Sequence, residues 1–332
     1  MPGDATTRLC DLPWRRFEVD TQVDPPVAAP CRNYPLTTNA RNLGRVESEL
    51  RALRMQLANG QPSGPCRTCP DKPLVNVAEL RAHLASAGLS VDANAMLREI
   101  QRVSTMDIPT PPAELMYRVA HTTDRTDFLI SGLITLFDVL PLIQRYDQHS
   151  RRRLLDWGSG CGRLALQIAR AVPEIELSGC DIDAAAVEWC QENIPTGRFR
   201  VSGLLPPTPF ERAQFTSIVG FSVLTHLSRA HQTAWIAELS DLLVPGGIVI
   251  VTVLGEAAAR RNGLAEDLRA YGILDDRRDP ALETVAPENY YRTTFQSRRS
   301  TEEAWNERFD LLEYIEAGAF NYQDIVVMKK RD

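Results

Sequence analysis

Short apolar runs alternate with amphipathic segments from Arg153 to the end of the chain. The run from Ile248 to Leu254 is continuous and rich in β-branched residues, which is typical of a parallel strand buried on both faces. Such alternation predicts a doubly wound α/β sheet. The expected strands are Leu154-Leu155, Glu176 to Cys180, Ser217 to Phe221, Ile248 to Leu254 and Asp324 to Met328, and the expected helices are Leu164 to Ala171, Ala184 to Asn193 and Arg229 to Leu243.

The chain before Arg153 has a different pattern. Residues 1–70 are proline-rich and irregular except for one predicted helix, Asn42 to Asn59, whose leucines follow helical spacing. Two short amphipathic helices are expected between Asn76 and Ser104. The stiff segment Asp107 to Pro112 is expected to be a linker or boundary, and a helix from Phe128 to Tyr146 leads into the sheet. We therefore divide the chain into residues 1–72, a helical linker 73–127, and an α/β domain 128–332.

The composition and net charge of the chain make some classes of function less expected. The 332 residues are 44% hydrophobic and 24% charged, which is ordinary for a globular protein with a core. A net charge of −6 gives no reason to expect nucleic-acid binding. We see no secretory signal and no apolar stretch of about 18 residues, so no membrane span is expected and the cytoplasm is the expected location.

A glycine-rich turn follows the first strand of the α/β region. Asp156 ends that strand, glycines stand at 158, 160 and 162, and a helix follows at once. Glycines let a backbone approach a ligand closely. A dinucleotide fingerprint would have the spacing G-x-G-x-x-G for a pyrophosphate. The observed G-x-G-x-G, preceded by an acid, suits a cationic sulfonium ligand with an ammonium group better.

A second acid ends the next strand. Asp181 follows Ser178-Gly179-Cys180, which is the position from which a carboxylate accepts both hydroxyls of a ribose. Asp183 is instead predicted to be the N-cap of the following helix.

These segments together resemble the motifs of bacterial class I methyltransferases. The resemblance runs from about Arg118 to Lys330, and its motifs are Leu155 to Gly162, Gly179 to Asp183, Phe221 to Leu227 and Leu243 to Gly247. It implies a seven-stranded Rossmann-like sheet, a cofactor-covering segment within 73–127, and S-adenosylmethionine (SAM) as cofactor. The implied cofactor-binding residues are Asp156, Gly158, Ser159, Gly160 and Gly162 in the turn, Asp181 and Ile182 at the ribose, Gly203 and Leu204 along the adenine, and Phe221.

Methyl transfer to a hydroxyl would use a base near neutral pH, and histidine suits that role. His226 follows the fourth strand, at the edge where α/β sheets bind ligands, and is the candidate general base. The alternative is that His226 only orders its loop. His121 is a weaker candidate of the same kind, and His231 is expected on the surface.

The acceptor is less constrained by the sequence. The aromatic stretch of Tyr290, Tyr291, Phe295 and Trp305 is either a substrate lid or core packing. Similar methyltransferases often act on glycans or natural products, so the expected acceptor is a small molecule, a sugar or glycan, or a natural product. Methylation of a peptide or carrier-bound substrate is an alternative.

Cysteines form a second feature. Cys161, Cys180 and Cys190 lie in the α/β pattern and are expected to be buried. Four further cysteines could supply the thiolate ligands for a tetrahedral zinc ion or a [4Fe-4S] cluster, and their spacing permits either. They are Cys10, Cys31, Cys66 and Cys69. This segment resembles the SPASM domain of radical SAM enzymes, which implies the cluster ahead of zinc. The glycine usual before the second cysteine and the later cysteines are missing, and four free thiols are a further alternative.

No Cys-x3-Cys-x2-Cys occurs, so the radical-generating cluster has no ligands and the chain is not a radical SAM enzyme. Two other classes remain open. One is an iron–sulfur binding or redox module whose α/β domain senses SAM. The other is an NAD-linked oxidoreductase, which the glycine spacing and Asp156 disfavour.

Overall fold

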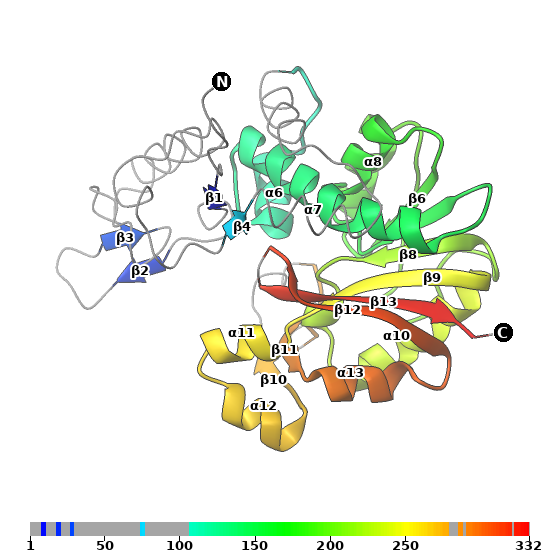
Figure 1. The fold of residues 1–332 in the computed structure, drawn as a ribbon. Helices are drawn as coiled ribbons and strands as arrows, with labels where there is room; N and C mark the ends of the chain where they lie inside the picture. Colours follow the sequence, from blue (N-terminus) through cyan, green and yellow to red (C-terminus); the bar gives the residue numbers. More distant parts are fainter. Residues whose placement is uncertain are drawn as a thin grey trace, which may run out of the picture. The chain divides into compact units, whose positions relative to one another are not determined.

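A computed structural model describes residues 106–278, 285–287, 290–320 and 322–331, and the backbone of four short strands before them (Figure 1). The chain divides into two compact units, Met1–Ile108 and Pro109–Asp332. The second unit begins inside the stiff segment that was expected to be a boundary. The expected border at 127/128 lies instead within helix α7, Arg125–Tyr146.

The first unit contains two small antiparallel pairs. Strand β1 (Arg8–Cys10) pairs with β4 (Leu74–Asn76), and β2 (Glu18–Asp20) pairs with β3 (Val27–Ala29). Cys10 lies in β1, of whose side chains nothing is described. Cys31, Cys66, Cys69 and the helices predicted between Asn42 and Ser104 lie outside the described residues.

The second unit is built on a seven-stranded sheet with the order β12-β13-β9-β8-β5-β6-β7. Strands β5 to β9 are parallel, and β13 runs antiparallel to β9 and to β12. The doubly wound sheet predicted from the sequence is therefore confirmed. The strands are β5 (Arg153–Trp157), β6 (Glu176–Asp181), β7 (Arg198–Val201), β8 (Phe215–Gly220), β9 (Leu243–Val253), β12 (Phe309–Ala319) and β13 (Gln323–Lys330).

The position of β5 sets the place of the site. From β5 the chain winds to β6 and β7 on one side, and then returns to β8 on the other side. The carboxyl ends of β5 and β8 therefore diverge at a topological switch point, where ligands of open α/β sheets bind.

Helices cover both faces of the sheet (Figure 1). Helices α7 and α8 (Ala165–Ala171) lie on one side, and α10 (Arg229–Leu242) and α13 (Arg298–Trp305) on the other. Two further helices are α6 (Ala113–Ala120) and α9 (Ala184–Asn193). The stretch Ala113–Tyr146 is long and apolar enough to cross a membrane, but 78% of its most apolar window is buried inside the protein, as in a core helix.

An insertion between β9 and β12 was not predicted from the sequence. It consists of α11 (Glu256–Arg261), α12 (Ala265–Tyr271), β10 (Ile273–Arg278) and β11 (Arg292–Gln296), followed by α13. Strand β10 contains Asp275, Asp276 and Arg277 and is half exposed, so it lacks the apolar alternation that identifies a strand.

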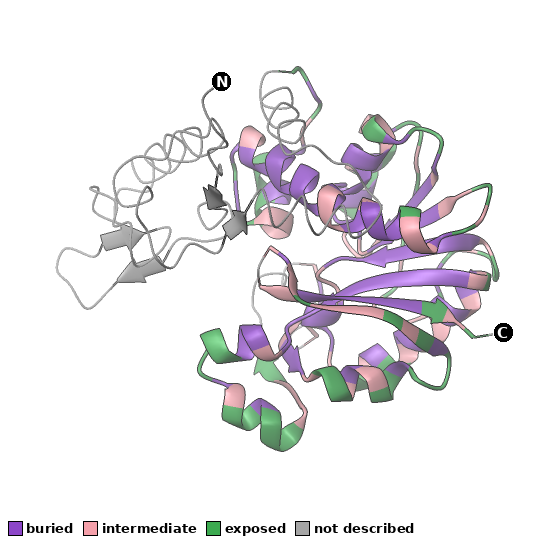
Figure 2. Ribbon diagram, in the orientation of Figure 1, coloured by how far each residue is buried: buried purple, intermediate pink, exposed green. Residues whose placement is uncertain are grey.

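Most of the sheet of the second unit is buried (Figure 2). The core contains the three cysteines predicted there. Cys161, Cys180 and Cys190 are all fully buried and free of disulfides, and burial raises the pKa of each thiol. Phe295 and Trp305, from the aromatic stretch, are also core residues, each 1% exposed.

Candidate active site

The glycine turn after β5 needs glycine for two reasons. Gly158, Gly160 and Gly162 all have positive φ, of 73°, 52° and 79°. A Cβ at Gly158 would lie 2.4 Å from Cγ2 of Val223, and one at Gly160 would lie 2.6 Å from Cγ2 of Val119. The N–H of Gly158 donates to the carbonyl of Cys180 over 2.8 Å, which ties the turn to β6. The turn is therefore a close-packed segment of backbone that borders the end of β6.

This turn borders a cavity at the carboxyl ends of the strands. The cavity holds about 1050 Å³ of space, part of it open to solvent, and residues after β5, β6, β7 and β8 line it together with α6. Of the residues predicted to bind a cofactor, those that line it are Asp156, Gly158, Ser159, Gly160, Asp181, Ile182 and Phe221, and those that do not are Gly162, Gly203 and Leu204.

The residues that do not line the cavity have structural contacts instead. A Cβ at Gly162 would lie 2.8 Å from Cδ1 of Ile194 and 3.0 Å from Sγ of Cys190, so this glycine permits close packing. The carbonyl of Leu204 accepts a hydrogen bond from the hydroxyl of Tyr290. Ser202, the residue before Gly203, lines the cavity in this region.

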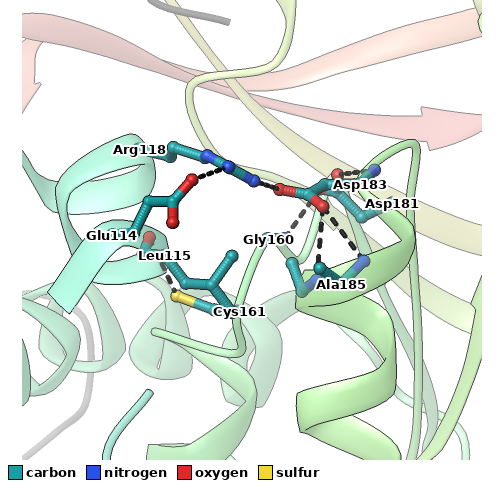
Figure 3. Close-up of polar contacts among 9 residues, drawn as sticks. Glu114, Leu115, Arg118, Gly160, Cys161, Asp181, Asp183 and Ala185 are labelled. Atoms are coloured by element: carbon teal, nitrogen blue, oxygen red, sulfur yellow. Dashed lines mark hydrogen bonds and ion pairs between the residues drawn. The ribbon is translucent and has the colours of Figure 1, made fainter. Parts of the chain in front are cut away.

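Asp181 joins the two strand ends that form the site (Figure 3). Its Oδ2 accepts the N–H of Gly160 over 2.7 Å, and its Oδ1 accepts the N–H of Asp183 over 2.9 Å. Burial raises the pKa of this carboxyl. Asp181 therefore fixes the glycine turn as well as bordering the cavity.

Asp183 is the N-cap of α9, which confirms the prediction. Its Oδ1 accepts the N–H groups of Ala185 and Ala186 over 3.1 and 3.3 Å. Its Oδ2 accepts from Nη1 of Arg118 over 2.7 Å, and Arg118 also pairs with Glu114 on the same helix, α6 (Figure 3). These contacts hold α6 at the cavity. Sequence analysis did not single out Arg118, because its partner is distant in the chain.

Asp156 is a buried acid with an unused oxygen. It is 3% exposed, and its Oδ2 has no hydrogen-bond partner among the described residues. Its pKa is raised to about 7, mainly by burial; the positive charge of Arg163 lowers it and the negative charge of Asp181 raises it. Burying a polar atom without a partner costs about 1–3 kcal/mol. A cationic group in the cavity would remove that cost.

His226 lies in the cavity wall, and its Nδ1 has a hydrogen-bond partner. It ends the short helix η1 (Leu224–His226), and its Nδ1 lies 3.2 Å from the carbonyl oxygen of Arg292. A carbonyl only accepts hydrogen bonds, so Nδ1 carries the proton and, in the neutral ring, Nε2 is the basic nitrogen. The ring also lies 5.2 Å from that of Tyr291, which borders the same cavity.

His121 and His231 do not line the cavity. His121 is exposed and caps α6 with a φ of 51°. His231, expected on the surface, is half-buried, because its ring packs 4.9 Å from that of Tyr290.

Ser222 carries local strain in the cavity wall. Its φ is +62°, which is uncommon outside glycine. Its N–H donates to Oγ1 of Thr252 over 2.7 Å, and its hydroxyl lies 2.8 Å from Nε2 of Gln323. Contacts to β9 and β13 therefore hold the loop that carries Phe221 and His226.

Comparison with known proteins agrees with this architecture. Residues 154–247 match the family model described as a methyltransferase domain. Methyltransferase str2 of Strobilurus tenacellus is 29% identical over 108 residues, which cover 32% of this chain and 38% of str2. Methyltransferase str3 of the same organism is 26% identical over 145 residues, covering 43% of this chain and 50% of str3. The chain thus spans half or less of these relatives.

Solved structures are also similar. A SAM-dependent methyltransferase from Methanosarcina mazei is 17% identical, with a TM-score of 0.45, over 57% of this chain and 97% of that one. The N-methyltransferase NodS from Bradyrhizobium japonicum, solved with S-adenosylhomocysteine (SAH), is 15% identical, with a TM-score of 0.41, over 71% of this chain and 99% of NodS.

Residues 154–247 match a methyltransferase domain, as the motifs predicted. The strand order, with five parallel strands and an antiparallel pair at one edge, agrees with the Rossmann-like sheet that those motifs imply. Among the described residues no cluster of His, Cys, Asp or Glu could hold a metal. The proposed ligands Cys10, Cys31, Cys66 and Cys69 lie outside the side chains described.

Proposed function

We propose that this protein transfers the methyl group of SAM to a hydroxyl of a small molecule. The observation that carries the proposal is the unpartnered Oδ2 of buried Asp156 in a glycine-walled cavity. An uncompensated carboxylate oxygen there suits a cationic ligand and would repel a pyrophosphate, which argues against NAD.

The cavity residues fit the cofactor by their chemistry. Asp156 would accept the ammonium group, the glycine turn leaves room for the amino-acid end, and Asp181 would accept the ribose hydroxyls. When bound, SAM supplies an electrophilic methyl group. The protein then contributes mainly by holding the acceptor oxygen in line, because a direct displacement depends on alignment.

His226 is the proposed general base. The carbonyl of Arg292 fixes its Nδ1 proton and its ring orientation, so that Nε2 can take a proton from an acceptor hydroxyl. The ring of Tyr291 lies beside it, 5.2 Å away between centroids and tilted by 45°. The histidine is therefore held in one orientation on the wall of the cavity.

Replacing His226 with glutamine is expected to lower kcat by about 100- to 10,000-fold, the usual contribution of a general base. SAH should bind about as tightly as to the natural protein, because Asp156 and Asp181 are untouched. SAH release with a panel of phenols, hydroxy acids and sugars measures the rate, and calorimetry measures SAH binding. His121→Gln is the matched control, since His121 is exposed and outside the cavity lining. An unchanged kcat in His226→Gln would show that this histidine only orders the loop.

Aromatic side chains suggest the shape of the acceptor. Trp235, Tyr290 and Tyr291 all border the cavity with His226. Aromatic faces bind planar rings and the apolar faces of sugars, so we propose a cyclic acceptor, including natural products and glycans. A peptide or carrier-bound acceptor is the second candidate, suggested by the likeness of the N-terminal cysteine segment to SPASM domains.

We also propose that Cys10, Cys31, Cys66 and Cys69 bind one [4Fe-4S] cluster in a cytoplasmic protein, with zinc as the alternative. Four thiolates leave no open coordination position, which favours a structural or docking role.

Replacing Cys66 and Cys69 with serine is expected to remove iron and sulfide from anaerobically purified protein and abolish its visible absorption. Cys161→Ser is the control, because this cysteine is buried in the other unit. Stoichiometric zinc, or no metal, in the unmodified protein would refute the cluster. If the visible absorption of the protein bleaches reversibly and no acceptor is methylated, the alternative of an iron–sulfur redox module whose α/β domain senses SAM is favoured.

A further inference from the structure

Arg163 is a cationic residue in the cavity wall, and none of the functions described above involves it. It directly follows Gly162, and it borders the same cavity as Asp156. Its guanidinium carbon lies 5.3 Å from the ring centroid of Phe221 and 5.8 Å from that of Phe320. These aromatic contacts hold the side chain in place without using its N–H donors.

The other arginine of the cavity is committed elsewhere. Arg118 gives Nη1 to Asp183 and Nη2 to Glu114. Arg163, by contrast, makes no hydrogen bond and no ion pair with any residue in the part of the chain that the structure describes. Its guanidinium therefore has donors available to a ligand, and guanidinium donors pair best with a planar anion such as a carboxylate.

Two unused charged groups thus lie in one part of the cavity. Within the part of the chain that the structure describes, Asp156 has a buried carboxylate oxygen without a hydrogen-bond partner, and the Arg163 guanidinium contacts two aromatic rings but has no hydrogen-bond partner. They are near enough for the positive charge of Arg163 to lower the pKa of Asp156, yet they form no salt bridge with each other. A ligand that carries an ammonium and a carboxylate on the same carbon would satisfy both groups at once.

We infer that Arg163 binds the carboxylate of the amino-acid group of SAM while Asp156 binds its ammonium group. This rests on the proposed SAM binding, and it makes Arg163 the residue that distinguishes the full cofactor from adenosyl ligands without a carboxylate. No bond of the ligand is made or broken in this contact. Arg163 acts on affinity and on the orientation of the amino-acid end.

The test compares three ligands on the full-length protein by calorimetry. They are SAH, its decarboxylated analogue S-adenosyl-3-thiopropylamine, and methylthioadenosine, which lacks the amino-acid group. The unmodified protein is expected to bind SAH about 10- to 100-fold more tightly than the decarboxylated analogue, the range for hydrogen bonds to a charged group. Arg163→Met should bind these two about equally. Arg163→Lys should keep part of the preference, because it retains the charge but loses the planar fork.

Methylthioadenosine shows whether the variant cavity is intact. It should bind to Arg163→Met as well as to the unmodified protein, because it has no carboxylate to lose. If Arg163→Met keeps the full preference for SAH, the inference is refuted and the arginine only stacks on Phe221 and Phe320. The inference is also refuted if Arg163→Met raises the KM for an acidic acceptor but still prefers SAH to the decarboxylated analogue, since Arg163 would then bind the acceptor.

Failure of the inference can be separated from failure of the proposed function. If the unmodified protein binds SAH and the decarboxylated analogue equally, Arg163 does not bind the carboxylate, but SAM remains the cofactor. If it binds none of the three ligands, the proposed function fails and the inference fails with it.

Discussion

Replacing Asp181 with alanine is expected to weaken SAH binding by at least about 100-fold, since it removes an acceptor for two ligand hydroxyls, each worth about 1.5–3 kcal/mol when the partner is charged. The substitution also frees the N–H groups of Gly160 and Asp183, which the carboxylate now accepts. The glycine turn would therefore lose its tie to the end of β6. Calorimetric titration with SAH measures the loss.

Two further variants separate the effects of Asp181. Asp181→Asn keeps one oxygen acceptor and the same volume, so it should lose less affinity than the alanine variant. Asp310→Ala removes an exposed acid that pairs with Arg331 at the sheet edge, and it should leave SAH binding unchanged. Unchanged SAH affinity in Asp181→Ala would remove Asp181 from the binding site.

Replacing Gly160 with valine is expected to abolish SAH binding while the protein still folds. A Cβ there would lie 2.6 Å from Cγ2 of Val119 on α6, so the new side chain either displaces that helix or enters the cavity. The φ of +52° adds strain of about 1–2 kcal/mol for a residue other than glycine. SAH titration and the thermal unfolding temperature measure the two effects.

Gly263 provides a matched control for this substitution. Its φ is +71°, but a Cβ there would have no atom within 4 Å. Gly263→Val should therefore show the backbone strain as a lower unfolding temperature and keep its affinity for SAH. Equal affinities in the two valine variants would mean that Gly160 does not border the ligand.

The sequence predicted the centre of the sheet better than its edges. Strand β9 contains a continuous buried run rich in β-branched residues, and β8 is buried along its whole length, with Ile218 and Val219 at its centre. Strand β7 has one buried residue, Phe199, among three exposed ones, and β12 carries Asp310, Glu313 and Glu316 at the sheet edge. Neither edge strand has the alternation of a half-buried strand, so neither was predicted.

The site residues that the sequence identified are those with a local signal, and the residues it missed depend on contacts between distant parts of the chain. Asp156, Asp181 and the glycines were identified because each stands next to its strand in the sequence. Arg118 was missed because its contact with Asp183 spans 65 residues. Gly203 and Leu204 do not line the cavity, whereas Ser202 just before them does, and the Leu204 carbonyl accepts a hydrogen bond from Tyr290, so their predicted contact with the adenine stays a prediction. Tyr290 and Tyr291 follow an irregular segment, and only the fold brings them to His226.

The buried position of Asp156 has a consequence for proton balance. With a pKa of about 7 in the free protein, the carboxyl is largely protonated below that pH, whereas an ammonium ligand requires the ionised form. Binding below pH 7 must therefore expel a proton to solvent, and affinity should fall by about tenfold for each pH unit of acidification. Above pH 7 no proton leaves, and the affinity should be level.

The same group links acidity to folding in the opposite sense. An unfolded Asp ionises near its ordinary pKa of about 3.9, so between there and pH 7 the unfolded chain loses a proton that the folded, ligand-free protein keeps. This carboxyl therefore makes the ligand-free protein progressively less stable as the pH rises through that interval. A cationic ligand that pairs with the ionised Asp156 would reverse the loss, so such a ligand should stabilise the domain most strongly above about pH 7.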